Sequence, residues 1–193
     1  MFITCYLFDG VDDYILSTYG KLIPNQNIYT ITGWFNIPST AIGVSNRVLV
    51  ALSEGSFPRF SPCFWTQYKP IIYLSSSNFK YGTSDLRDDK WHYVVFIVTG
   101  SNNEDINNAK IYVDGIEEKY STPLSSTAPT APNGNFTIGE GFIGKLDDVR
   151  IYNAALSSSQ IKKQYVAGLD SLLSKNLISK EEYNIKIESL ASN

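Results

Sequence analysis

The chain has 193 residues and a formal net charge of −3 at pH 7. A chain of this length can bury a sizeable core without disulfides or metals, and one domain with a small appendage accounts for it. The acidic balance excludes nucleic acid as the main partner, because that binding needs a basic surface. The sequence contains no run of about 18 apolar residues, so we expect no insertion into a membrane.

The N-terminal stretch MFITCYLFDG has neither a basic region nor a small-residue cleavage site. We therefore expect no secretory signal peptide and synthesis in the cytoplasm. Cys5 and Cys63 could form a disulfide only if the fold brings them together, and two unpaired, packed thiols are the favoured interpretation.

Runs in which apolar and polar residues alternate recur through the first 156 residues. Short clusters of Gly, Asn, Ser, Pro and Asp separate these runs, a pattern typical of an all-β sandwich or barrel. The runs that we expect to form strands are residues 29–37, 46–53, 69–77, 91–100, 109–115, 135–139 and 144–153.

Two of these runs differ in which faces they can bury. The run WHYVVFIVTG (91–100) is apolar on both faces, so it predicts a central strand that is covered on both sides. The run YTITGWFNI (29–37) instead alternates large apolar residues with threonine and asparagine, which predicts one wet face. Trp34 falls on this wetter face and is therefore a candidate contact residue.

The hydrophobic period becomes helical after residue 156. Ser157 and Gln160 form a capping box, and we expect this helix to end at Gly168. The segment 121–135, STPLSSTAPTAPNGN, is a long loop before it, and loops of this length are usually functional or disordered.

The residues that follow predict two further short amphipathic helices. The second has its own capping box, from Ser179 to Glu182, with an apolar stripe that ends at Leu190. Such helices cannot form a core alone, so they must pack on the back of the sandwich or on a neighbouring subunit. We divide the chain into a sandwich domain, residues 1–168, and a helical tail for packing or assembly, residues 169–193.

Several segments in order along the chain resemble the laminin-G-like domains of the concanavalin A-like lectin/glucanase superfamily. The resemblance covers about residues 5–165 and implies a jelly-roll sandwich of two antiparallel sheets, with a concave face that commonly binds glycans or proteins. The tail weakly resembles the short C-terminal helical (SHOCT-like) module through LLSKNLISKEEY. The segments that carry the main resemblance are YLFDGVDDYI, YTITGWFNIP, DDKWHYVVFIVTG, KIYVDGIEE and FTIGEGFIGKLDDVRIYNAALSSSQIKKQY.

The resemblance also implies that the first and last strands pair, which would bring two groups of aspartates close together. A structural calcium ion is found near this junction in related folds. Hard cations take six to eight oxygen ligands, so backbone carbonyls and water would complete the site. The implied metal ligands are Asp9, Asp12, Asp13, Asp147 and Asp148.

Asp147 and Asp148 stand inside an expected strand, where an unpaired buried charge is costly. Adjacent strand residues project to opposite faces, so we expect that these two carboxylates do not face one substrate together. The Glu-x-Asp-x-x-Glu run of related glucanases is absent from the sequence. We expect one aspartate to face Arg150 or a backbone turn, and the other to ligate a cation or cap the FDG loop.

A catalytic role finds little support elsewhere in the sequence. His92 is the single histidine, so any Ser-His-Asp or Cys-His arrangement would have to use it. It lies in mid-strand, where a packed or hydrogen-bonded histidine is the favoured interpretation. We therefore expect a protein that is not an enzyme.

The segment 57–82 is dense in aromatic residues, which can stack on sugar rings when they are partly exposed. The alternative is that most of them are ordinary strand residues of a tyrosine-rich sandwich. The candidate ligand-binding residues, with the tryptophan of the earlier strand, are Trp34, Arg59, Trp65, Gln67, Tyr68, Tyr73, Asn78 and Tyr81.

The favoured function is non-catalytic recognition of a carbohydrate or glycoprotein through aromatic stacking and hydrogen bonds. The alternative is a structural subunit of a phage or virus particle, such as a capsid decoration or tail protein, that assembles through residues 169–193 as an oligomer or with a virion partner. Release from the cell would then occur in a virion, by lysis or by non-classical export. A glycan-active enzyme is the third possibility.

Overall fold

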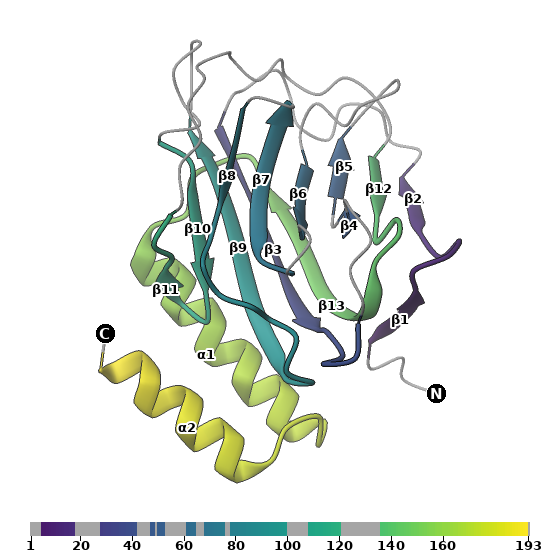
Figure 1. Cartoon of the computed structure of the whole chain (residues 1–193). Helices are drawn as coiled ribbons and strands as arrows, with labels where there is room; N and C mark the ends of the chain where they lie inside the picture. Colours follow the sequence, from purple (N-terminus) through teal and green to yellow (C-terminus); the bar gives the residue numbers. More distant parts are fainter. Residues whose placement is uncertain are drawn as a thin grey trace.

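The computed structural model describes residues 5–17, 28–41, 47–48, 50–52, 61–64, 68–75, 78–99, 108–120 and 136–192. Two layers of strands form a sandwich, and two helices lie against the outer face of one layer (Figure 1). The strands are β1 (Tyr6–Asp9), β2 (Ile15–Ser17), β3 (Ile28–Asn36), β4 (Arg47–Val48), β5 (Val50–Leu52), β6 (Ser61–Phe64), β7 (Pro70–Ser75), β8 (Asn78–Tyr81), β9 (Trp91–Thr99), β10 (Lys110–Val113), β11 (Ile116–Glu117), β12 (Phe136–Ile138) and β13 (Ile143–Tyr152). The helices are α1 (Ser158–Ser174) and α2 (Lys180–Ala191).

One layer is a six-stranded antiparallel sheet in the order β1-β13-β3-β9-β10-β11. The other layer consists of a three-stranded sheet, β2-β12-β5, and a four-stranded sheet, β4-β6-β7-β8. Strand β1 pairs with β13, with Asp9 opposite Ile143, so the first and last strands are neighbours as expected. The predicted antiparallel β-sandwich with C-terminal helices is confirmed.

The main core lies between the two layers, and β9 runs through the middle of the six-stranded sheet. Val94, Phe96 and Val98 of β9 face this core. The alternate residues Tyr93 and Val95 face the helices, as do other members of a second apolar cluster. The prediction that this strand is covered on both sides is therefore confirmed.

Strand β3 is also covered on both sides, so the prediction that one of its faces is wet is wrong. Thr30 and Thr32 have no exposed surface, and the hydroxyl of Thr30 donates to the carbonyl of Ala154 at 2.7 Å. The reason is that α1 lies across this face of the sheet (Figure 1). A threonine in a strand fits a buried pleated surface as well as a wet one, and only the long-range packing of α1 decides between them.

The first helix begins where the sequence predicts and ends later. Ser157 and Gln160 form the predicted capping box, but α1 continues through Gly168 to Ser174, so the predicted end is wrong. Asn176, with φ of 56°, ends the helix instead, because this left-handed residue lets the following N–H groups bond to carbonyls of the last turn. The described tail therefore forms one further helix, α2, and not two.

The helices pack on their own sandwich, which is one of the two arrangements expected for them. Ile161, Tyr165, Leu169 and Leu172 of α1 are buried against the six-stranded sheet. Leu190 and other apolar residues of α2 pack at the edge of the same cluster. No helix in the described parts of the chain is long and apolar enough to cross a membrane.

Several predictions concern residues that the structure does not describe. These are the loop 121–135, Arg59, Trp65, Gln67 and the side chain of Cys63. Cys5 is described, and its thiol is free and packed beside the helical layer.

Candidate functional site

The structure separates the predicted ligand-binding residues that it describes. Trp34 is 2% exposed beneath α1, so its indole does not lie on a wet face. Tyr68 is 1% exposed in the core between the layers, with the guanidinium of Arg87 5.4 Å from its ring centroid. Tyr81 is partly buried in β8, opposite Ile71 of β7. Tyr73 and Asn78 lie in β7 and β8, but their side chains are outside the described residues.

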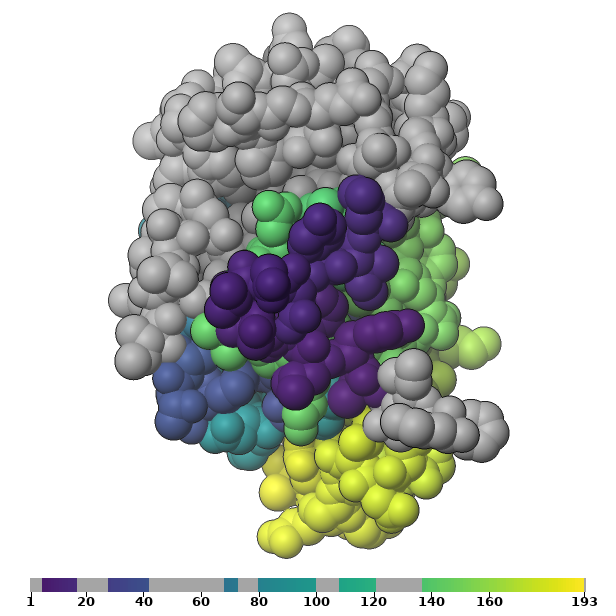
Figure 2. All heavy atoms as spheres, turned by 90° about the vertical axis from the view of Figure 1, so that its right-hand side faces the viewer, coloured from purple at the N-terminus to yellow at the C-terminus, as the bar shows by residue number. Residues whose placement is uncertain are grey.

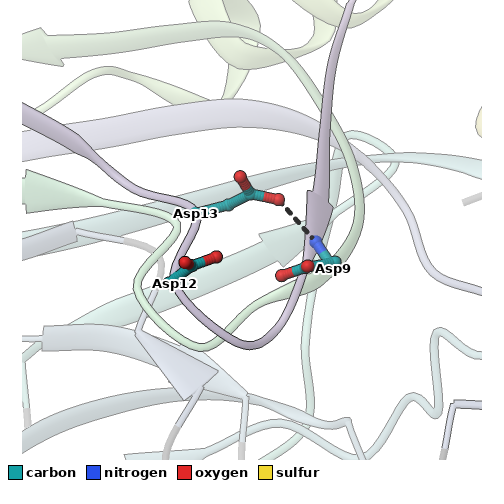
Figure 3. A group of neighbouring side chains, drawn as sticks. All are labelled: Asp9, Asp12 and Asp13. Atoms are coloured by element: carbon teal, nitrogen blue, oxygen red, sulfur yellow. Dashed lines mark hydrogen bonds between the residues drawn. The ribbon is translucent and has the colours of Figure 1, made fainter.

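Three of the five predicted metal ligands lie together in the turn between β1 and β2 (Figure 3). One oxygen atom from each of Asp9, Asp12 and Asp13 falls within 4.8 Å of the others, and all three side chains are exposed. The N–H of Asp9 donates to Asp13 Oδ2 at 2.9 Å, and the N–H of Val11 donates to Asp9 Oδ1 at 2.8 Å. The turn is thereby held in a shape that directs carboxylate oxygens toward one point.

Asp147 and Asp148 do not join that group, because both are engaged elsewhere. Asp148 Oδ1 accepts a hydrogen bond from Arg150 Nε at 2.7 Å, which confirms the predicted pairing of one aspartate with that arginine. Asp147 Oδ2 accepts from Lys175 Nζ of the α1 C-terminus at 3.2 Å. No hydrogen bond among the described residues joins Asp147 or Asp148 to the FDG loop, and cation binding by either stays a prediction.

A β-bulge in β13 explains how two consecutive aspartates fit into a paired strand. Asp147 lies opposite Trp34 and Arg150 lies opposite Thr32, so β13 has one extra residue across this interval. Asp148 lies in this bulge and has a φ of 49°, a left-handed conformation that is uncommon for residues other than glycine. The expectation that the two side chains face opposite sides of the sheet is wrong, because the bulge interrupts the alternation.

The bulge and α1 enclose a pocket of about 290 Å³, which we call the bulge pocket. Its lining from α1 is Gln164, Ala167, Gly168, Ser171, Leu172 and the adjacent Lys175, and its lining from the sheet is Trp34, Tyr93, Asp147, Asp148 and Arg150. The two aromatic residues are almost fully buried. The bulge pocket thus has charged and polar walls over a buried aromatic base.

Hydrogen bonds orient the polar groups of the bulge pocket. The hydroxyl of Tyr93 donates to Gln164 Oε1 at 2.7 Å, which leaves the amide N–H groups of Gln164 as donors. Burial raises the pKa of Tyr93 to about 12, so this phenol keeps its proton at neutral pH. The hydrogen bond to Asp148 raises the pKa of Arg150 above its ordinary value. The arginine therefore remains a cation throughout the physiological range.

His92 belongs to a second polar network, which fastens α2 to the sandwich. Its Nδ1 lies 2.9 Å from Asp114 Oδ2 and its Nε2 lies 3.0 Å from Asp88 Oδ1. Asp114 Oδ2 also accepts from Lys186 Nζ of α2 at 3.1 Å. The prediction of a hydrogen-bonded histidine is confirmed. Because both ring nitrogens face carboxylates, the ring is positioned to donate from both.

Burial and ion pairing have opposing effects on the pKa values of His92 and Asp114. Burial alone would lower the pKa of His92, but the hydrogen bond and charge of Asp114 outweigh it, and the pKa is raised. Burial would raise the pKa of Asp114, whereas its bond from His92 and the charge of Lys186 lower it overall. The charged pair is thus favoured in the folded protein over a wide range of pH.

Reasoning from the sequence missed the part of the bulge pocket that comes from α1. Gln164 and Lys175 follow the strand aspartates by many residues, and nothing in their local pattern separates them from ordinary exposed helix residues. One signal was available. Two carboxylates and an arginine within five strand residues, LDDVR, conflict with strict alternation, and such a conflict is typical of a bulge.

The sequence matches the family model of the concanavalin A-like lectin/glucanases superfamily over residues 9–162. The chain belongs to this superfamily. The family match extends across the sandwich and the first turn of α1, and it stops before most of the helical lining of the bulge pocket. None of the curated proteins compared with the chain is similar to it in sequence.

Solved structures share the fold at low sequence identity. Domain 4 of AbnA, an extracellular arabinanase from Geobacillus stearothermophilus solved in complex with arabinotriose, is 21% identical with a TM-score of 0.59, and the alignment covers 82% of this chain and 75% of that one. The heptameric SAP-like pentraxin from Limulus polyphemus is 13% identical with a TM-score of 0.59, covering 81% and 78%. The binding domain of botulinum neurotoxin serotype D/C is 14% identical with a TM-score of 0.60, covering 82% of this chain and 42% of that one.

Proposed function

We propose that this chain is a non-catalytic carbohydrate-recognition domain and that the bulge pocket is its site. The observation that carries the proposal is the mixture of hydrogen-bond donors and acceptors that converge on this small pocket. Sugar hydroxyl groups donate and accept at once, so they match such a wall better than a purely basic or acidic ligand does. Membership of a lectin and glucanase superfamily and the arabinotriose complex of a similar domain support the same class of ligand.

The mechanism would be hydrogen bonding to preoriented side chains rather than stacking. Asp148 Oδ2 has no hydrogen-bond partner among the described residues and can accept from a ligand hydroxyl. The Gln164 amide and the Lys175 ammonium have N–H groups beyond those used in their present bonds, and these can donate. Trp34 and Tyr93 are too deeply buried to offer a full ring face. The predicted stacking role of Trp34 is therefore replaced by a role as the base of the pocket.

We propose recognition without hydrolysis because the carboxylates of Asp147 and Asp148 lie side by side in the bulge pocket. Glycosidases place two carboxyl groups on either side of the scissile bond. Asp147 and Asp148 are consecutive residues on the same wall of the bulge pocket, so they cannot flank a glycosidic bond in that way. The segment 57–82 remains a proposed additional contact surface, and Tyr81 is its partly buried candidate with a described side chain.

We also propose a structural calcium ion at the acidic turn of Asp9, Asp12 and Asp13. Carboxylate oxygens within 4.8 Å of one another fit the ligand type and spacing that a hard cation requires. These three residues would hold the ion, which would neutralise their mutual repulsion and fix the turn between β1 and β2. Asp147 and Asp148 belong to the bulge pocket and are not part of this proposal.

The proposed function is tested by measuring the binding of the full chain to a broad glycan array, together with an assay for release of reducing ends from each glycan that binds. Saturable binding without release supports recognition without catalysis. Release that a single aspartate variant abolishes would show an enzyme instead. Absence of any glycan binding, with the protein folded by circular dichroism, would refute carbohydrate recognition.

A second candidate function, a subunit of a larger assembly, is favoured by one surface. Six large apolar side chains are exposed within residues 6–16, which belong to β1, β2 and their connecting turn, and Figure 2 shows this N-terminal segment spread over one face. They are Tyr6, Leu7, Val11, Tyr14, Ile15 and Leu16. Clustered exposed apolar residues mark interaction surfaces more often than scattered ones do.

The assembly candidate has a matched test, because the tail also exposes one apolar residue. Leu7 is 71% exposed in β1 and Ile185 is 58% exposed in α2. Light scattering of the full chain gives its oligomeric state. Loss of an oligomer in Leu7→Lys and its retention in Ile185→Lys would place the contact at the N-terminal surface, whereas the reverse would support assembly through residues 169–193. A monomer in the wild type would count against self-assembly.

A further inference from the structure

We infer that the bulge pocket takes one uncharged sugar unit and discriminates against acidic sugars, with the C-terminal part of α1 forming one of its two walls. The inference rests on the proposed function and goes beyond it in naming the class of sugar and the charges that select it. It stands on four observations of the bulge pocket: its charge balance, its hydrogen-bonding groups, its size and the way its walls are held.

The charges that line the bulge pocket balance to zero. Asp148 pairs with Arg150 at 2.7 Å and Asp147 pairs with Lys175 at 3.2 Å. A ligand carboxylate would approach both cations only by lying next to the two aspartates. The repulsion from the two aspartates would offset the attraction to the two cations, so a ligand carboxylate would lose its hydration without a net electrostatic gain. A ligand ammonium would likewise be repelled by Arg150 and Lys175. The equal number of positive and negative charges around the pocket therefore favours an uncharged ligand.

The same ion pairs leave hydrogen-bonding capacity for a neutral polar ligand. Each carboxylate has two oxygens, and Asp148 uses one of them for Arg150. An ammonium has three N–H donors, and Lys175 uses one for Asp147. Ser171 and the Gln164 amide lie on the facing helix. Adjacent ring hydroxyls, each a donor and an acceptor, can therefore bond to both walls together.

The volume of the bulge pocket limits how much of a glycan can enter. Ligand pockets in proteins commonly have volumes of about 300–1,000 Å³. At about 290 Å³ the bulge pocket is at the small end of this range, which suits one sugar ring better than a long glycan. The rest of a longer glycan would have to extend out of the pocket across the surface.

Backbone conformations at the bulge and at the end of α1 hold both walls of the bulge pocket in place. Asp148 has φ of 49° in the bulge, and Asn176, directly after Lys175, has φ of 56° at the end of α1. Asn176 and Leu177 donate to the carbonyls of Leu173 and Leu172 at 3.0 and 2.9 Å, which sets the position of Lys175. The left-handed Asn176 is an ordinary helix end, whereas the left-handed Asp148 interrupts a strand, and strained non-glycine residues of that kind cluster at functional sites.

The structure supplies a matched control for the central carboxylate. Asp85 and Arg87 form an ion pair at the same sequence spacing as Asp148 and Arg150, and both aspartate side chains are 44% exposed. Asp85 does not line the bulge pocket. Asp148→Asn and Asp85→Asn therefore remove equivalent charges at one site that is proposed to bind a sugar and at one that is not.

The test is calorimetric or NMR titration of the full chain with glucose and glucuronate, and with galactose and galacturonate, which differ within each pair only in the acid group. We expect the wild type to bind a neutral sugar at least tenfold more tightly than its acid partner. Asp148→Asn removes an acceptor and gives the pocket a net positive charge. It should weaken the neutral sugar about tenfold and shift the preference toward the acid, while Asp85→Asn changes neither value. Thermal unfolding confirms that each variant is folded.

Lys175→Met shifts the charge in the other direction and should strengthen the discrimination against the acid. A wild type that binds the acids as tightly as the neutral sugars overturns the inference. So does neutral binding that Asp148→Asn leaves unchanged, and that result keeps carbohydrate recognition but places it elsewhere. If no glycan binds on the array or in titration, the proposed function itself fails.

Discussion

At Gly168 the backbone of α1 lies directly against Trp34 of the sheet, and replacing the glycine with alanine tests that packing. An alanine Cβ at this position would lie 2.4 Å from Trp34 Nε1 and 2.6 Å from both Cε2 and Cζ2 of the indole. Favourable contacts begin near 3.5 Å, so either the ring or the helix has to move by about 1 Å.

The indole of Trp34 has little freedom to move away. It is 2% exposed, its centroid lies 5.6 Å from that of Tyr165 with the rings nearly parallel, and it lies 5.3 Å from Tyr93. Overpacking in a rigid core costs about 1–3 kcal/mol, and three contacts below 2.7 Å place this change near the upper end. Alanine recovers about 1 kcal/mol through its helix propensity. We therefore expect Gly168→Ala to lower the free energy of unfolding by about 2 kcal/mol.

The neighbouring residue provides the control. Ala167 is exposed on the same helix turn, so Ala167→Gly measures the difference in helix propensity without a clash, and it should cost about 1 kcal/mol. Urea unfolding followed by tryptophan fluorescence gives the free energy of unfolding for each variant. If Gly168→Ala is more stable than the wild type by the amount that Ala167→Gly loses, the close approach of α1 to Trp34 does not exist and the glycine has no steric role.

Two further predictions concern the other polar sites. The raised pKa of His92 stabilises the fold fully below the unfolded pKa of about 6.5, and this stability is lost as pH rises through the folded pKa. The lowered pKa of Asp114 acts in the opposite direction. It stabilises the fold above an unfolded pKa of about 3.8, and this stability is lost as pH falls through the folded pKa. The free energy of unfolding should therefore fall on going from pH 6 to pH 9 in the wild type and fall less in His92→Gln, and equal slopes would contradict the network. Calcium should raise the melting temperature of the wild type but not of Asp12→Asn, as scanning calorimetry with and without chelator would show, and an equal shift in both proteins would exclude the acidic turn.

The fold could be predicted because its main signals are local. The two apolar faces of residues 91–100 predicted a central strand, and β9 has that position. The N-cap serines Ser157 and Ser179 begin the two helices as predicted, although only Ser157 has both hydrogen bonds of a capping box. Each of these signals depends on a few neighbouring residues, so the sequence displays it directly.

The errors arose where a distant element decides the outcome. The alternation of β3 is the same whether solvent or α1 covers its threonine face, so burial of that face could not be predicted from the strand alone. Glycine is common directly after the last turn of a helix, so the sequence predicts a helix end at Gly168. Its actual role is to let α1 approach Trp34, a residue more than a hundred positions earlier in the chain.

The bulge in β13 connects these errors to the candidate site. Strict alternation would put Asp147 and Asp148 on opposite faces of the sheet, one of them in the apolar core, where an unpaired carboxylate is costly. One extra residue in the strand removes that cost, because it keeps Val149 facing the core and turns both carboxylates toward α1. The same shift sets their two ion pairs with Arg150 and Lys175 around one pocket. The position where the sequence departs from its strand pattern is therefore the position where the structure forms a polar site.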